Sequence, residues 1–276
     1  MNSCYLDLAY LPLYNELKLS KIALKNVNKK GLISLTLEDE NNLEDIVKAN
    51  KLKIGWLDFD FNYNYDSDFP YDKVVNLVKR FSLNQVILTL PKINDFELDK
   101  SEFKEAVINI IKTFRQNRIK VVFQIDYKED SAIIAYLISE IKEISFVFDS
   151  KACFQSDKSI STYYRLLRSK IEIFIVSDID EKKEATLLGY GKAQLKDMAL
   201  RLKHDNFKGD ILYQFNLDDY LENRNKLYKK RLPFMKGKSF NSHLFIEEKL
   251  ELTKTDTITY EDLFIKQYNI FSYLFK

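Results

Sequence analysis

The feature that most constrains the fold of this chain is a regular alternation between two apolar patterns. Short apolar runs of strand length are followed by segments in which apolar residues recur at helical spacing, and the cycle repeats eight times before residue 230. The expected strands are 5–10, 32–37, 53–61, 85–90, 119–125, 144–148, 171–176 and 211–215. The expected helices are 14–27, 41–49, 71–81, 100–116, 131–141, 160–168, 192–204 and 218–230.

Two architectures are compatible with this alternation, a closed (β/α)8 barrel and a doubly wound open sheet. The central strands, such as 85–90 and 171–176, are nearly continuous apolar runs, as expected when helices cover both faces of a parallel sheet. Alternation alone does not separate the two. The length of 276 residues suits one barrel, which typically needs about 250 residues, with a modest extension.

The segment 233–276 follows the last expected helix and has its own pattern. It contains an expected strand at 244–252 and an expected helix at 260–275, whose aromatic and aliphatic residues form an apolar stripe. We expect this stripe to be covered, either by the rest of the chain or by a partner such as a second copy. We therefore divide the chain into a barrel, 1–232, and a C-terminal extension, 233–276.

Composition limits the function classes. The 43 basic and 41 acidic residues give a net charge of +2, which argues against nucleic acid as a partner because no basic excess is present. Two cysteines and two histidines do not match the spacing of a zinc-finger set. We find no signal peptide and no run of 18 apolar residues, so we expect a cytoplasmic protein that does not enter a membrane.

Three segments near the end of the alternating region resemble a known family. They are 176–180 (Val-Ser-Asp-Ile-Asp), 187–191 (Leu-Leu-Gly-Tyr-Gly) and 207–214 (Phe-Lys-Gly-Asp-Ile-Leu-Tyr-Gln). Their order and spacing resemble the sugar-phosphate isomerase/epimerase family, the xylose-isomerase-like TIM barrels whose superfamily includes AP endonuclease family 2. Members show a strand ending in His-x-x-Asp, a Leu-Gly-x-Gly loop and a strand ending in a metal-binding Glu. The resemblance implies the closed barrel rather than the open sheet.

The carboxyl ends of the strands carry the active site in a (β/α)8 barrel. Polar residues that follow the expected strands are therefore the site candidates: Asp7, Glu38, Asp58, Asp60, Thr89, Lys92, Gln124, Asp126, Asp149, Ser177, Asp178, Asp180, Gln214 and Asn216. An Asp in this position is also the usual cap of a loop or helix. We favour that interpretation for Asp58, Asp60 and Asp178.

The resemblance implies a divalent metal held at the ends of strands five to eight. Carried over, the strand-five Glu falls on Gln124, or on Asp126 if the strand register shifts by two, and the strand-six Asp falls on Asp149. The strand-seven His becomes Ser177 and the strand-eight Glu becomes Gln214. Because amides and hydroxyls are weak ligands for a divalent ion, we expect the family's metal site not to be intact.

A weaker cation site is a second interpretation of the same residues. Asp149 could bind Mg²⁺ or Mn²⁺ weakly, with Asp126, Asn216 and water as further oxygen ligands. We interpret Asp149 and Asp126 as catalytic in ligand or acid–base roles, and Lys151 as a catalytic cation that could neutralise a sugar phosphate or an enolate. The residues expected to bind substrate are Gln124, Ser177, Asp180, Gln214, Asn216 and Lys92.

Three functional hypotheses follow from the resemblance and these residues. The first is an enzyme of the isomerase, epimerase or dehydratase-type lyase class acting on a small hydroxy-carbonyl or sugar-like compound. The second is a non-catalytic barrel that uses the same scaffold to bind a ligand or partner. The third is a nucleic-acid enzyme, which the balanced charge disfavours. The expected partners are a carbohydrate-like small molecule and a second copy bound through the aromatic tail.

Overall fold

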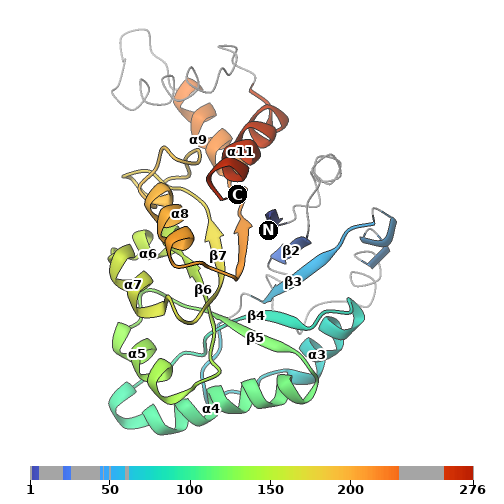
Figure 1. The fold of residues 1–276 in the computed structure, drawn as a ribbon, viewed down its shortest axis with the longest axis vertical. Helices are drawn as coiled ribbons and strands as arrows, with labels where there is room; N and C mark the ends of the chain where they lie inside the picture. Colours follow the sequence, from blue (N-terminus) through green and yellow to red (C-terminus); the bar gives the residue numbers. More distant parts are fainter. Residues whose placement is uncertain are drawn as a thin grey trace.

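The computed structural model of the protein describes residues 2–5, 21–25, 44–45, 47–49, 51–59, 62–229 and 258–275. Eight parallel strands close into a barrel in which neighbours in sequence are neighbours in space and β1 pairs with β8 (Figure 1). The strands are β1 (Asn2–Tyr5), β2 (Lys21–Lys25), β3 (Ile54–Phe59), β4 (Gln85–Thr89), β5 (Lys120–Gln124), β6 (Phe146–Asp149), β7 (Ile171–Val176) and β8 (Asp210–Tyr213). The predicted (β/α)8 barrel is confirmed.

Helices alternate with the strands and lie outside them (Figure 1). They are α3 (Tyr71–Arg80), α4 (Phe96–Gln116), α5 (Ser131–Glu140), α6 (Ser150–Gln155), α7 (Ile160–Leu167), α8 (Leu195–His204), α9 (Leu217–Lys229) and α11 (Tyr260–Leu274). Polar residues begin several of them, because a side-chain oxygen satisfies backbone N–H groups in the first turn. The Asp95 carboxylate does so for α4, and Asp130 does so for α5.

Apolar side chains form two separate clusters, because successive residues of a strand point to opposite faces. The larger cluster joins one face of the strands to the helices. The smaller cluster takes alternate residues from β2 to β8 and no helical residue, so it is the barrel interior: Ala23, Trp56, Ile87, Val122, Val147, Ile173, Ile175 and Leu212. Trp56 is fully buried there and is the largest side chain of this cluster.

The first part of the chain departs from the sequence prediction. The helix expected at 14–27 is wrong where the structure describes it, because Lys21–Lys25 is β2 and pairs with both neighbouring strands. Ile22, Ala23 and Leu24 are all buried, as the middle of a barrel strand requires. A short apolar run does not distinguish a strand from a buried helix turn. Here, pairing with a strand on each side makes the segment a strand.

This change moves the expected end of the second strand. β2 ends at Lys25, so Glu38 does not end the second strand of the barrel. β1 ends at Tyr5 within the described residues, whereas the expected strand was 5–10. Asp7, Glu38, Asp60, the expected strand 32–37 and the expected strand 244–252 all lie outside the described residues.

From residue 51 to 229 the predicted elements agree with the structure apart from boundaries and one short helix. α4 begins at Phe96 rather than at residue 100, because Asp95 accepts hydrogen bonds from the Glu97 and Leu98 N–H groups. α6 was not predicted; it has only six residues, too few to show helical spacing. Among the described helices, none is long and apolar enough to cross a membrane.

The C-terminal helix α11, predicted at 260–275, lies beside α9 near the end of β8 (Figure 1). Its aromatic residues contact the outer side of β7 and β8: the ring of Phe271 lies 5.3 Å from Tyr213, and Phe275 lies 5.9 Å from Phe174. The apolar stripe of α11 is thus largely covered by the chain's own barrel. Association with a second copy through this tail stays a prediction, as does the domain boundary at 232.

Candidate functional site

Six successive strands share one pattern at their carboxyl ends. Each has an apolar residue in the barrel interior, and two positions later a polar residue that points the same way because side chains alternate. The pairs are Trp56 and Asp58, Ile87 and Thr89, Val122 and Gln124, Val147 and Asp149, Ile175 and Ser177, and Leu212 and Gln214. We call the six polar residues (Asp58, Thr89, Gln124, Asp149, Ser177 and Gln214) the mouth ring.

Strand pairing fixes how the ring members neighbour one another. Thr89 and Gln124 are direct partners across β4 and β5. Asp149 is the partner of Ile175, two residues before Ser177. The Gln214 N–H donates to the Val176 carbonyl over 3.0 Å, which continues the pairing of β7 and β8 to the level of Ser177. The barrel therefore brings together Gln124, Asp149, Ser177 and Gln214, four of the residues selected from the sequence.

Two members of the ring were not selected from the sequence as catalytic or binding residues. Asp58 is fully buried, although we favoured a loop cap for it, and Thr89 is 8% exposed but was not among the selected binding residues. The signal that identifies both is the spacing of two from an interior apolar residue, Trp56 and Ile87. That signal needs the strand limits and the inward face to be known.

Several polar atoms at the mouth are buried without a hydrogen-bond partner in the described part of the chain. They are Thr89 Oγ1, Gln124 Oε1 and Ser177 Oγ of the ring, and Nδ2 of Asn216, which lies two residues after Gln214. An unsatisfied buried donor or acceptor costs about 1–3 kcal/mol, so such atoms are uncommon. Their gathering at the carboxyl ends of the barrel indicates a place where a polar ligand or water completes the hydrogen bonds.

Asp149 has two structural roles in addition to its place in the ring. Its Oδ1 accepts hydrogen bonds from the N–H groups of Lys151 (2.9 Å) and Ala152 (3.1 Å), so it caps α6. Its own N–H donates to the hydroxyl of Tyr127 over 3.0 Å. Burial raises the pKa of the Tyr127 phenol well above its usual range, so this hydroxyl stays protonated. Asp149 is thus held rigidly, and only its Oδ2 is left for a ligand. Lys151 is half-buried in the first turn of α6.

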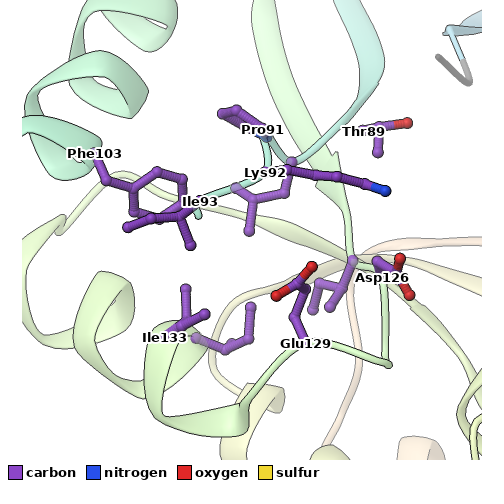
Figure 2. A pocket seen from close by; sticks show the side chains of 11 residues that line it. Thr89, Pro91, Lys92, Ile93, Phe103, Asp126, Glu129 and Ile133 are labelled. Carbon is purple, nitrogen blue, oxygen red and sulfur yellow. The ribbon is translucent and has the colours of Figure 1, made fainter. Parts of the chain in front are cut away.

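Asp126 and Lys92 lie beside the ring rather than in it. They line a cavity of ≈ 10 Å³, about the space of one water, together with Thr89, Glu129 and apolar residues of α4 and α5 (Figure 2). Figure 2 shows the Lys92 side chain extending toward Thr89 and Asp126. Asp126 follows β5 by two residues, and its Oδ1 accepts a hydrogen bond from the Lys128 N–H over 3.0 Å, which stabilises the turn.

Asp178 organises the loop that follows β7. Its Oδ2 accepts from the N–H groups of Gly189 (2.9 Å) and Gly191 (3.0 Å), and its Oδ1 accepts from those of Ile179 (3.0 Å) and Ala193 (3.2 Å). Burial raises the pKa of this carboxyl, and the four N–H groups oppose that rise. Asp178 is therefore a structural residue, in agreement with the cap interpretation.

Asp180, selected as a binding residue, also contacts backbone. Its Oδ1 accepts from the N–H groups of Lys182 (2.8 Å) and Glu184 (2.9 Å) and closes the turn after Asp178. Of the polar residues that end β7, Ser177 is the one that points into the barrel, and it is only 1% exposed.

The mouth ring does not fit the divalent metal that the sequence resemblance implies. The positions that would supply ligands hold two amides (Gln124 and Gln214), one hydroxyl (Ser177) and one carboxylate (Asp149), whose Oδ1 already accepts two N–H groups. In the described residues, no group of three or more His, Cys, Asp or Glu side chains is arranged to hold a metal. Neutral oxygen donors do not offset the cost of dehydrating such an ion.

No protein-family model matches the sequence, and no curated protein matches it. Solved structures do match. A D-psicose 3-epimerase from Clostridium cellulolyticum H10, solved with D-tagatose, has a TM-score of 0.61 at 10% identity, over 100% of this chain and 99% of that chain. The probable 3-DHS dehydratase AsbF from Bacillus anthracis has a TM-score of 0.60 at 13% identity, over 84% of this chain and 99% of that chain.

A xylose isomerase domain protein from Planctomyces limnophilus is similarly related, with a TM-score of 0.60 at 12% identity over 83% of this chain and 97% of that chain. These similarities show a shared fold. In fold the chain is similar to xylose-isomerase-like TIM barrels, as the sequence resemblance implied, and its structural neighbours include a sugar epimerase, a sugar phosphate isomerase/epimerase and a probable dehydratase.

Proposed function

We propose that the protein acts on a small hydroxy-carbonyl or sugar-like compound bound at the mouth ring. The observation that carries this proposal is the set of buried, unpartnered atoms at the carboxyl ends of the barrel, Thr89 Oγ1, Gln124 Oε1, Ser177 Oγ and Asn216 Nδ2. A ligand rich in hydroxyl groups offers both donors and acceptors to such atoms. Two structural neighbours are D-psicose 3-epimerases whose structures were solved with D-tagatose or D-fructose, which supports the same class of ligand.

The reaction we propose is transfer of a proton at the carbon next to a carbonyl, as in isomerisation, epimerisation or dehydration. Asp149 is the proposed base, and it takes the proton on Oδ2 because Oδ1 is held by α6. Lys151 in the first turn of α6, and Lys92 beside Thr89, are the proposed cations that stabilise the developing enolate oxygen. Asp126 is the proposed second acid–base group at the edge of the site.

A non-catalytic binding protein is the second candidate, and one observation favours it. Asp178, Asp180 and one oxygen of Asp149 are all engaged by backbone N–H groups, so few carboxylate oxygens remain for proton transfer. In this case the ring would hold its ligand without changing it.

Proton exchange separates the two candidates. A panel of ketoses that includes D-fructose and D-tagatose is incubated with the protein in D₂O, and loss of the proton next to the carbonyl is followed by NMR. Exchange should fall about 10²-fold or more in Asp149→Asn, because Asn still caps α6 but is not a base. Binding without exchange by the wild-type protein would favour the non-catalytic candidate, and absence of binding by every sugar would refute the proposal.

A further inference from the structure

We infer that the mouth ring recognises an uncharged, hydroxyl-rich ligand by direct hydrogen bonds, with neither a divalent metal ion nor a phosphate group taking part. This inference rests on the proposed function and specifies the ligand class. It rests on three observations: the chemistry of the unpartnered atoms, the carboxylates around the mouth, and the hydrogen bonds that Asp149 already accepts.

The unpartnered atoms are neutral and of mixed type. Thr89 Oγ1 and Ser177 Oγ each offer one donor and acceptor capacity, Gln124 Oε1 offers an acceptor, and Asn216 Nδ2 offers donors. A sugar hydroxyl can donate to the Gln124 oxygen and accept from the Asn216 amide or from either hydroxyl. A fully ionised phosphate group offers acceptors only, so in this position it would leave Gln124 Oε1 without a donor.

Charge at the mouth also favours a neutral ligand. The ring contains the carboxylates of Asp58 and Asp149, and the adjoining cavity adds those of Asp126 and Glu129. Lys92 lines the same cavity as Asp126 and Glu129 and is half-buried. These carboxylates repel a phosphate group, and the repulsion is strongest where water is excluded.

Metal recruitment is disfavoured by the same residues. At the positions of Gln124 and Gln214 an amide stands where the resemblance implies a carboxylate, so neither side chain brings a negative charge to offset the dehydration of a divalent ion. Asp149 Oδ1 is shared between two N–H donors, and turning it toward a metal would remove the cap of α6. Hydrogen bonding by the ligand itself requires no such rearrangement.

The test compares one sugar in two forms and under two metal conditions. D-fructose and D-fructose 6-phosphate are titrated into the protein by calorimetry, once with EDTA and once with Mn²⁺. We expect D-fructose to bind with affinities that differ by less than twofold between the two conditions, and the phosphorylated form to bind more weakly. Binding that needs Mn²⁺, or that is tighter for the phosphate, would overturn the inference while leaving the proposed function in place. No binding of either form in any condition would overturn both.

Two variants separate recognition from stability. Because Ser177 Oγ is buried without a partner, Ser177→Ala should leave the urea midpoint unchanged or raise it, yet weaken D-fructose about threefold to tenfold. Ser145→Ala is the matched control: this buried hydroxyl donates to the Val121 carbonyl over 3.1 Å just before β6, at the amino end of the barrel. It should lower the urea midpoint without changing affinity. If Ser177→Ala behaves like Ser145→Ala, the ring hydroxyl is structural and the inference fails.

Discussion

Replacing Gly191 by Ala tests whether the Asp178 carboxylate holds the loop after β7. A Cβ at residue 191 would lie 2.1 Å from Asp178 Oδ1 and 2.4 Å from the Ile179 carbonyl oxygen. Both distances are far below any van der Waals contact, and neither atom belongs to the free end of a flexible side chain. The carboxylate must therefore move away from its four N–H donors, or the loop must move away from the carboxylate.

The cost follows from those hydrogen bonds. Asp178 accepts from Ile179, Gly189, Gly191 and Ala193, and moving the carboxylate by about 1 Å breaks those on the side of residue 191. A hydrogen bond to a charged group contributes about 1.5–3 kcal/mol, so loss of two lowers the free energy of unfolding by about 3–6 kcal/mol. That is a large share of the stability of an ordinary domain.

Gly189→Ala is the control in the same loop. Gly189 has φ = +83°, and an added Cβ would meet nothing closer than Lys196 Cε at 3.8 Å. Its cost is therefore the backbone strain alone, about 1–2 kcal/mol. Urea unfolding followed by far-UV circular dichroism measures both variants. A Gly191→Ala variant no less stable than Gly189→Ala would show that the Asp178 contacts do not hold the loop.

Two further predictions concern α11 and the buried thiol. Gln267→Ala should lower the free energy of unfolding by about 1–3 kcal/mol. The reason is that Gln267 Oε1 accepts a hydrogen bond from the Leu188 N–H over 2.7 Å, and this buried donor would be left unpaired. Urea unfolding measures the loss, and an unchanged urea midpoint would contradict the prediction. Burial raises the pKa of Cys153 from 9.0 to about 12, so the folded state keeps this proton between those pH values while the unfolded chain loses it. Wild-type stability should therefore fall as pH rises above 9, and urea midpoints at pH 8 and 10.5 should diverge less in Cys153→Ala than in wild type.

The fold was predictable where pattern and length agreed. Between residues 51 and 229 the strands are apolar on both faces and the helices have a clear apolar stripe, so local sequence and tertiary packing favour the same structure. At 21–25 they do not: Ile22, Ala23 and Leu24 fit a helix turn as well as a strand. Pairing with β1 and β3, which are distant in sequence, makes this segment a strand.

The site was predictable in part for a related reason. Knowing that strand ends build the mouth was enough to select Gln124, Asp149, Ser177 and Gln214. It was not enough to separate them from Asp180, whose carboxylate contacts only its own turn in the described structure. The facing direction of a residue depends on the register of its strand, and register is fixed by neighbouring strands rather than by local sequence.

The use of carboxylates and neutral groups in this barrel supports direct recognition of a neutral ligand. Asp178, Asp180 and Asp149 bind backbone N–H groups of the loops and of α6, so these charges stabilise the walls of the mouth. The unpartnered atoms of Thr89, Gln124, Ser177 and Asn216 are uncharged. Restoring the charged positions with Ser177→His and Gln214→Glu together would then have two opposed effects. Mn²⁺ affinity would rise if the ring geometry suits a metal, and affinity for D-fructose in EDTA would fall because two neutral hydrogen-bonding groups are lost. A double variant that gains Mn²⁺ and keeps its metal-free affinity for the sugar would show that these two positions do not contact the ligand.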